Sequence, residues 1–413
     1  MGLIVQKFGG TSVGTPERVQ LVAARVARER RAGSEVVVVV SAMGHNTDEL
    51  LKLAGQVTRD ARRRHPRELD MLLTAGERIS MALLAMAIRD TGVEAISLTG
   101  SQAAIITDET HTGARIAEVR ATRVREELSK GCVVIVAGFQ GVSRAKEVTT
   151  LGRGGSDTTA VALAAALGAE RCDIFTDVKG VYTADPRRVP AARLLRRVDY
   201  GEMVELASSG AQVMHPRAVE IGAKFGVPIR VLSSFDEDGG SSGTVITNRQ
   251  ERMEGLVITG LASQSGFARL ILRGLPASTR AVTRVVTELA ANGVSVDMLV
   301  IADRPDARRQ LQLTVREDAA EDALAICERL RDELGGDRVE LETELSRVAL
   351  VGSGMVDLPG VYARAFEALV SAGIEVHAVS TSSISITVLV DSDNEGPALQ
   401  LLHAAFDLAV EPE

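Results

Sequence analysis

The chain has 413 residues, which exceeds the usual size of a single domain and predicts two or three domains. Its net charge of -8 argues against a nucleic-acid binder that gains affinity by neutralising phosphates. Apolar residues make up 45% of the chain and aromatic residues only 3%, so the cores must consist of Ala, Val, Leu and Ile.

The three cysteines are Cys132, Cys172 and Cys327, and their number and wide spacing indicate neither a disulfide framework nor a zinc site. Each lies among apolar residues, which predicts buried free thiols. The N-terminus lacks the charged segment, apolar segment and small-residue cleavage site of a signal peptide, and no run of 18 apolar residues occurs. We therefore expect a soluble, cytoplasmic protein with no membrane partner.

The first 235 residues alternate between predicted strands and predicted helices. Val36 to Val40 is an uninterrupted run of valines, which is typical of a strand buried on both faces of a parallel sheet. The alternation predicts an α/β domain with a mostly parallel sheet sandwiched by helices. The predicted strands cover 3–8, 36–40, 95–98, 132–136 and 172–177, and the predicted helices cover 16–31, a segment from 48 onward, 69–88 and 160–167.

Four polar loops follow predicted strands of this sheet, at residues 7–12, 41–48, 138–141 and 176–185. Ligands of parallel α/β sheets bind outside the carboxyl ends of the strands. Because all four loops lie at such ends, we expect them to form one binding site.

A glycine-rich loop at 149–159 runs directly into an Ala/Leu helix at 160–167. Its glycines let the backbone approach a ligand, and Arg153 offers a planar fork suited to a carboxylate or phosphate. Ser156 or Asp157 is expected to cap the helix, whose N-terminus attracts anions. The loop therefore indicates an anion site, although a plain turn before a core helix would also fit.

A Gly/Ser/Asp-rich segment at 233–243 indicates an exposed loop near a domain boundary. Beyond it, two stretches share one order of strands and helices, and the junctions 289–297 and 369–377 match in sequence. We interpret them as an internal repeat of about 75 residues. The predicted elements are strands 268–272, 294–301 and 311–315 with helices 279–291 and 319–334, then strands 347–351, 374–380 and 383–390 with helices 360–372 and 396–409.

Six motifs, in order along the chain, resemble those of the aspartate kinases of the amino-acid kinase superfamily. They are 7–12 (KFGGTS), 41–44 (SAMG), 76–78 (GER), 138–141 (GFQG), 152–157 (GRGGSD) and 176–187 (TDVKGVYTADPR). The C-terminal pair resembles the tandem ACT domains of that family, so the resemblance spans essentially the whole chain. It implies a kinase domain at 1–245 and two α+β ferredoxin-like ACT domains at 260–338 and 345–413, with a strand at 255–263 completing the second ACT unit.

The resemblance implies transfer of the γ-phosphoryl group of ATP to the β-carboxylate of L-aspartate, giving 4-phospho-L-aspartate. This is the first step of lysine, threonine and methionine biosynthesis. The implied cofactors are ATP and Mg²⁺, with the ion bridging the phosphates mostly through water and no protein metal ligand predicted. No GxxxxGK[ST] pattern is present, so the phosphates must be held in another way.

The resemblance also implies roles for individual residues. Lys7 takes the transferring phosphoryl group, and Arg153 takes a carboxylate of aspartate. Glu77 and Asp157 take the ammonium, and Asp157 joins Lys7 as a catalytic residue. Further implied contacts are Ser41, Thr47 and Ser156 for the substrate, and Lys7, Phe8, Gly9, Gly10, Gly154, Gly155, Thr176, Asp177, Tyr182, Asp185 and Arg187 for ATP.

The ACT pair implies feedback by lysine, threonine or both, and assembly of a homo-oligomer through ACT contacts. The implied effector residues are Asn292, Val296, Asp297, Met355, Ser380 and Thr381. The first unit departs from the family pattern at 275–279 and 301–303, whereas the second unit keeps the turn at 357–360 and the Ser-Thr-Ser at 380–382. The effector site is therefore open to being altered, weak or absent, and the pair could serve only as an oligomerisation scaffold.

Two other functions stay open at this point. A catalytically silent, amino-acid-sensing regulatory protein is disfavoured because Lys7, Arg153 and Asp157 are all present. Another carboxylate kinase of the superfamily is disfavoured by Glu77 and by the ACT pair. The pattern does not distinguish a dimer from a tetramer.

Overall fold

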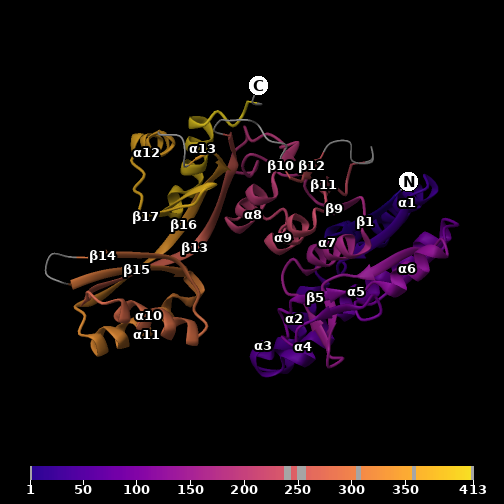
Figure 1. The fold of residues 1–413 in the computed structure, drawn as a ribbon, viewed down its shortest axis with the longest axis horizontal. Helices are drawn as coiled ribbons and strands as arrows, with labels where there is room; N and C mark the ends of the chain where they lie inside the picture. The colour runs from indigo at the N-terminus through magenta and orange to yellow at the C-terminus, as the bar shows by residue number, and fades with distance from the viewer. Residues whose placement is uncertain (1, 237–242, 249–256, 304–307, 356–359, 411–413) are drawn as a thin grey trace. The chain divides into compact units, whose positions relative to one another are not determined.

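The structure is a computed structural model that describes residues 2–236, 243–248, 257–303, 308–355 and 360–410. The chain divides into two compact units (Figure 1). The first contains residues 1–182, 194–208 and 212–253, and the second contains 183–193, 209–211 and 254–413. The expected turn at 357–359, residues 237–242 of the Gly/Ser segment and residues 255–256 of the expected strand lie outside the described residues.

Within the described residues, the first unit is built on an eight-stranded sheet. Neighbouring strands are parallel except for β11 and β12, which are antiparallel. From edge to edge the strands are β10 (Arg197–Val198), β12 (Thr244–Ile246), β11 (Ile229–Ser233), β9 (Arg171–Thr176), β1 (Leu3–Phe8), β2 (Glu35–Val40), β6 (Val133–Ala137) and β3 (Ala95–Leu98).

Helices cover both faces of this sheet, as the alternating sequence pattern predicts. α1 and α5 pack together on one face, and α7 packs on β1, β2 and β9. The helices of the unit are α1 (Pro16–Arg31), α2 (Asn46–Val57), α3 (Ala61–Arg64), α4 (Pro66–Leu73), α5 (Ala75–Asp90), α6 (Thr122–Ser129), α7 (Gly155–Leu167), α8 (Tyr200–Ser208) and α9 (Pro216–Phe225), with a 3₁₀ turn η1 (Gly10–Val13).

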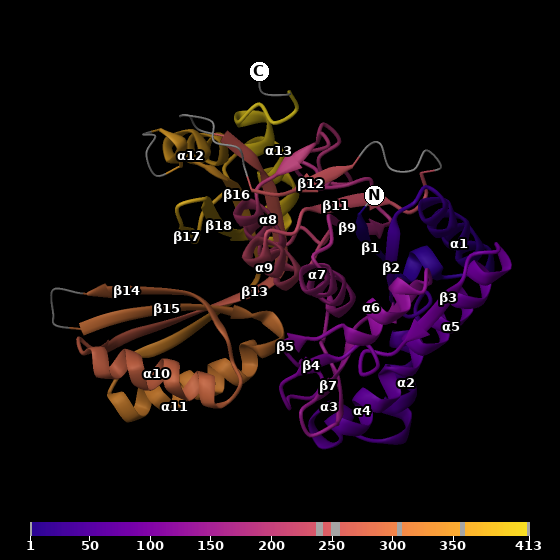
Figure 2. The same ribbon diagram turned by 45° about the vertical axis from the view of Figure 1, so that its right-hand side comes forward.

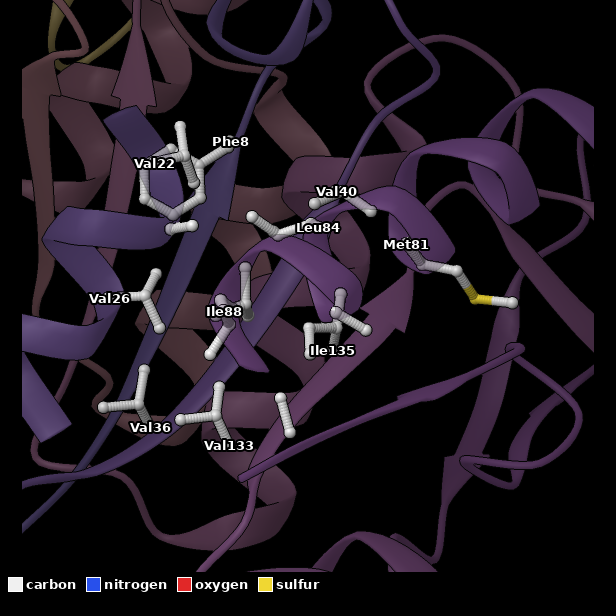
Figure 3. Close-up of a cluster of buried hydrophobic side chains, with 14 of the residues drawn as sticks. Phe8, Val22, Val26, Val36, Val40, Met81, Leu84, Ile88, Val133 and Ile135 are labelled. Carbon is white, nitrogen blue, oxygen red and sulfur yellow. The ribbon is translucent and has the colours of Figure 1, made fainter. Parts of the chain in front are cut away.

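The valine run of β2 is buried on both faces of the sheet. Val36, Val38 and Val40 join the core beneath α1 and α5, whereas the intervening Val37 and Val39 are equally buried. Figure 3 shows side chains of α1, α5, β2 and β6 converging on this cluster. The central strands are therefore rigidly held, and their carboxyl ends can position a site.

The predicted helix at 69–88 lies within a helical stretch at 66–90, which is divided at Thr74 into α4 and α5. The Thr74 hydroxyl donates to the carbonyl of Met71, and the Thr74 carbonyl accepts from Nε2 of the Gln140 side chain. Both bonds compete with the helical pattern. By length and composition residues 66–90 could cross a membrane, but half of the apolar window is buried in the fold, as in a core helix.

A small four-stranded sheet lies beside the main one in the described part of the first unit, and the sequence did not predict it. Its strands are too short to show an alternating pattern. They are β5 (Ile116–Val119), β4 (Ile105–Thr107), β7 (Gln140–Ser143) and β8 (Val148–Thr150).

The second unit contains, in its described residues, one antiparallel six-stranded sheet in the order β14-β15-β13-β16-β18-β17. Figure 2 shows α10 and α11 against one face of it. Its elements are β13 (Val257–Pro276), α10 (Thr279–Ala291), β14 (Val296–Asp303), β15 (Arg308–Arg316), η2 (Glu317–Ala319), α11 (Ala320–Leu334), β16 (Arg338–Ser353), α12 (Val361–Ser371), β17 (Ala378–Thr381), β18 (Ser385–Asp391), η3 (Ser392–Asn394) and α13 (Glu395–Ala405).

Two long strands, β13 and β16, run through both halves of this sheet. Residues 257–265 pair with 346–353, and residues 267–273 pair with 338–345. One half has its own core with α10 and α11, and the other has a separate core with α12 and α13. The half with α12 and α13 therefore contains residues 257–265, where the family resemblance implied a strand at 255–263. The pairing of residues 338–345 into the half with α10 and α11 was not expected.

The segment 183–193 leaves the first unit and packs in the core of the second. Ala184 and Val189 are buried with the side chains of α12 and α13. The Thr183 hydroxyl lies 2.9 Å from Nε2 of His403, and Arg188 forms an ion pair of 2.5 Å with the buried Glu395.

The cysteine prediction is correct for two of the three thiols. All three are free, and Cys172 and Cys327 are buried, whereas Cys132 is only partly buried.

Candidate active site

Loops after β1, β2 and β6 and the loop before α7 meet at a cavity of about 300 Å³ in the first unit. This is the carboxyl edge of the parallel strands, where ligands of such sheets bind. The cavity brings together every residue predicted to be catalytic or to contact aspartate: Lys7, Ser41, Thr47, Glu77, Arg153, Ser156 and Asp157. Gly10, Gly154 and Gly155 of the predicted nucleotide set also line it.

Lys7 and Asp157 form an ion pair in this cavity, with 2.7 Å between Nζ and Oδ1. Lys7 is the second-last residue of β1, and Asp157 is in the first turn of α7. Each side chain is about nine-tenths buried. Because a buried site screens charges poorly, each group strongly fixes the position of the other. The ammonium packs close to the backbone of Gly9, where an added Cβ would lie 3.4 Å from Nζ.

Glu77 is a buried carboxylate with an unsatisfied oxygen. It lies in the first turn of α5 and is 2% exposed. Oε1 accepts a hydrogen bond of 3.2 Å from the Ala42 amide, while Oε2 has no partner among the described residues. Burial raises the pKa of Glu77 to about 7. An unpaired oxygen of this kind suits an ammonium group of a ligand.

The loop before α7 is held in a left-handed conformation. Gly152 and Gly154 have φ angles of 76° and 68°, and a Cβ on Gly154 would lie 2.2 Å from Cβ of His215. Arg153 lies between them and is exposed. Within the described chain, Arg153 has no ion pair, so its guanidinium can accept an anionic ligand.

The predicted side-chain cap of α7 is wrong. The N-cap residue is Gly154, with no side-chain cap hydrogen bond. Because the helix begins at Gly155, Ser156 and Asp157 lie inside the first turn rather than before it. Asp157 pairs with Lys7 instead, and both side chains face the cavity.

The other residues predicted to bind ATP do not line this cavity. Phe8 is fully buried with its ring stacked on Phe175 at 4.7 Å, so only its backbone could contact a nucleotide. Asp185 pairs with Arg187 at 2.8 Å, which is the main reason that the pKa of Asp185 is lowered. The remaining members are Gly9, which precedes η1, Thr176, whose hydroxyl donates to Asp177, and Tyr182, which bridges to Leu194.

Sequence reasoning assigned no individual role to three residues that line the cavity: Ala42, Gly44 and Phe139. Ala42 acts through its backbone amide, which orients Glu77. Phe139 has a φ of 66°, which is rare for an aromatic residue. The motifs at 41–44 and 138–141 pointed to these loops, but backbone donors carry no residue-type signal.

The predicted effector residues lie in the second unit and are largely engaged within its fold. Met355 is a core residue, and Asp297 forms an ion pair with Arg347. Asn292 ends α10 and donates to the Glu288 carbonyl. Val296 begins β14, and Ser380 and Thr381 lie on β17. Their role as an effector site stays a prediction.

Comparison with known proteins identifies the family. The sequence model described as the amino acid kinase family matches residues 2–233, and an ACT domain model matches residues 348–406. An aspartokinase of Bacillus sp. (strain MGA3) is 46% identical, covering 99% of this chain and 98% of the relative. The chain belongs to the aspartokinases. The aspartokinase of Mycolicibacterium smegmatis is also 46% identical, covering 100% of this chain and 98% of the relative.

Solved structures of the family agree with the fold. Aspartokinase III of E. coli in complex with aspartate and ADP matches with a TM-score of 0.80 at 28% identity, covering 98% of this chain and 100% of that chain. The same enzyme in complex with lysine and aspartate matches with a TM-score of 0.74. The predicted aspartokinase family, amino-acid kinase fold and C-terminal ACT region are therefore confirmed.

Proposed function

We propose that this chain transfers the γ-phosphoryl group of ATP to the β-carboxylate of L-aspartate, giving 4-phospho-L-aspartate and ADP. The arrangement of charges in the cavity is the observation that carries the proposal. A zwitterionic dicarboxylate needs cations for its carboxylates and an anion for its amine. Lys7, the unpaired Arg153 and the unsatisfied oxygen of Glu77 supply these groups around one cavity. The aspartokinases to which the chain is similar support the same reaction.

Phosphoryl transfer depends on positioning and charge neutralisation more than on covalent help from the protein. Lys7 neutralises the transferring phosphoryl group, and Asp157 orients the Lys7 ammonium through their ion pair. Arg153 holds a carboxylate of aspartate, and Glu77 holds its ammonium. Ser41, Thr47 and Ser156 donate hydrogen bonds from the wall of the cavity.

Mg²⁺ is the second cofactor of the proposal. Within the described residues, no group of three His, Cys, Asp or Glu side chains could hold a metal ion. We expect the ion to be carried by the nucleotide phosphates, with water completing its coordination. When bound, Mg²⁺ neutralises the phosphate charge. The loop at 176–187 and the glycines after β1 contribute to nucleotide binding.

The proposal also covers the domains of the chain, its effectors and its assembly. The kinase domain covers 1–245, and ACT domains cover 260–338 and 345–413, with 255–263 completing the second. Lysine, threonine or both act as feedback effectors on the ACT pair, and ACT contacts join copies into a homo-oligomer in the cytoplasm. A lysine complex of the E. coli relative supports the effector part.

A hydroxamate assay tests the reaction. The purified chain with MgATP, L-aspartate and hydroxylamine is expected to form the β-hydroxamate of aspartate, and L-glutamate in place of aspartate is expected to give none. Lys7→Ala is the matched inactive control. Absence of product with the unaltered chain overturns the proposal. Repeating the assay with lysine and threonine, singly and together, tests the effectors.

A further inference from the structure

Asp70 is a fully buried carboxylate outside the cavity, at the centre of a hydrogen-bond network that the reaction does not explain. It lies on α4 and is 0% exposed. Its oxygens lie 2.7 Å from Nδ1 of His111 and accept a hydrogen bond of 2.5 Å from the Thr150 hydroxyl. They also accept from the backbone amide of Thr112 at 3.1 and 3.2 Å.

This network holds a strained residue. Thr112 has a φ of 62°, which is unfavourable for a β-branched side chain. Such a conformation persists only where the surroundings enforce it, and it concentrates at ligand sites. The two hydrogen bonds from the Thr112 amide to Asp70 provide that restraint.

Asp70 is connected to the Arg153 loop by two short routes. Through Thr150, it fixes the end of β8, three residues before Arg153. Through Thr112, it fixes a carbonyl oxygen that lies 3.3 Å from the position a Cβ would take on Gly152. Gly152 therefore packs against the residue that Asp70 holds in place.

We propose that Asp70 is a positioning residue that sets the affinity for aspartate by holding the Arg153 loop in its binding conformation. This inference rests on the proposed function, because it requires that Arg153 binds a carboxylate of aspartate. Asp70 touches neither substrate nor phosphate, and it acts through Thr112 and Thr150. Its loss weakens the binding of aspartate and leaves ATP binding unchanged.

The sharpest test uses neighbouring threonines of β8. Thr150→Val removes the hydroxyl that donates to Asp70 at nearly constant volume, and Thr150→Ser restores it. Thr149→Val is the matched control, because Thr149 is equally buried and its hydroxyl bonds to Thr107 at 2.7 Å instead. Asp70→Asn keeps the shape of the side chain and removes its charge.

The measurements are KM for aspartate, KM for ATP, kcat and direct calorimetric binding of L-aspartate. Loss of one hydrogen bond corresponds to between about twofold and tenfold in affinity. We expect Thr150→Val and Asp70→Asn to raise KM and Kd for aspartate by at least this factor, with KM for ATP within about twofold. Thr150→Ser is expected to restore the values, and Thr149→Val to lower the melting temperature only.

Two results would overturn the role of Asp70 without affecting the proposed function. One is unchanged aspartate binding by Thr150→Val, and the other is an equal loss of aspartate binding in Thr149→Val and Thr150→Val. If the unaltered chain binds no L-aspartate, the proposed function fails and the inference fails with it. Binding measurements therefore separate the two cases.

Discussion

The ammonium of Lys7 lies 2.7 Å from the carboxylate of Asp157, at the point where β1 and the first turn of α7 meet the cavity. The sequence suggested two tasks for Asp157, to hold the substrate ammonium and to take part in catalysis. Its pairing with Lys7 favours the catalytic task. We therefore propose the unsatisfied oxygen of Glu77 as the main acceptor for the ammonium.

Lys7→Ala is expected to lower kcat by about 10²- to 10³-fold, because one preorganised charge at a reacting centre contributes on that scale. Asp157→Asn is expected to lower kcat as well and to change KM for aspartate little, since Lys7 loses its orienting partner. Steady-state kinetics of the hydroxamate assay measures both parameters. Lys52→Ala, an exposed lysine of α2, is the control and is expected to be fully active. A rise in KM for aspartate without loss of kcat in Asp157→Asn would instead assign Asp157 to the ammonium.

Much of the site was predictable because its parts are local in sequence. Glycine-rich loops at 7–12 and 152–157 follow strands or precede a helix, and the parallel topology brings such ends to one edge of the sheet. That rule predicted the meeting of the loops after β1, β2 and β6 at one cavity, whereas the loop at 176–185 does not line it. Glu77, in the first turn of α5, was expected there only from the family resemblance. The role of Asp70 did not follow, because its partners are 41 to 80 residues away in the chain.

The fold of the C-terminal half was only partly predictable for a related reason. Helix periodicity located α10 to α13 to within a few residues. The extension of β13 and β16 through both repeats depends on pairing between segments far apart in sequence. Similarly, Ala184 and Val189 read as loop residues, and only tertiary packing places them in the core of the second unit.

Aspartate use is expected to depend on pH through Glu77. Burial raises the pKa of Glu77 to about 7, and only the ionised form can bind an ammonium. Consequently kcat/KM for aspartate should rise with pH through about 7 and level off above it. The profile of the hydroxamate assay between pH 6 and 8.5, compared with that for ATP, measures this. A flat aspartate profile over that range would contradict the assignment.

The ionised form of Glu77 is also expected to lower the free energy of unfolding. Its pKa is raised from 4.5 to about 7, so the folded state binds the proton more tightly than the unfolded state. Stability therefore falls as pH rises from 4.5 to 7, by about 3 kcal/mol, and the cost is complete above pH 7. Glu77→Gln should abolish aspartate binding while raising the free energy of unfolding at pH 8, with little gain at pH 4.5.

Urea unfolding at the two pH values checks this second effect of Glu77. Glu395→Gln is the matched control, because Glu395 is a buried glutamate that does have partners, Arg188 and Ser263. Its substitution should destabilise the protein at pH 8. An equal change in unfolding free energy at both pH values for Glu77→Gln would show that the charge is not the cause.

The thiols are expected to differ in reactivity. Burial raises the pKa of Cys172 well above its ordinary value and that of Cys327 to about 12, so neither forms the reactive thiolate in the folded state. Cys132 is partly exposed and should be labelled by a thiol reagent under native conditions. Mass spectrometry of the labelled peptides, before and after unfolding in urea, gives the order in which the three thiols react. Native labelling of Cys172 or Cys327 at the rate of Cys132 would refute the packing described for them.

The two glycines that flank α7 provide a test of the loop geometry. Gly154 and Gly168 have nearly the same left-handed φ, 68° and 66°. An added Cβ would meet nothing within 4 Å at Gly168, whereas at Gly154 it would lie 2.2 to 2.5 Å from atoms of His215. Alanine at either position should cost about 1–2 kcal/mol of stability through the left-handed backbone. Only Gly154→Ala also has to move the loop that carries Arg153.

We therefore expect Gly168→Ala to keep its activity and Gly154→Ala to lose about 10²-fold in kcat/KM for aspartate, the scale of a displacement near 1 Å in an active site. The double variant Gly154→Ala with His215→Ala should recover part of the loss, because the clash is removed. His215→Ala alone is the necessary control, since the His215 ring accepts a hydrogen bond from the Arg217 amide at the start of α9. Equal activity of Gly154→Ala and Gly168→Ala would mean that the loop tolerates displacement, and that the close packing of Gly154 on His215 does not position Arg153.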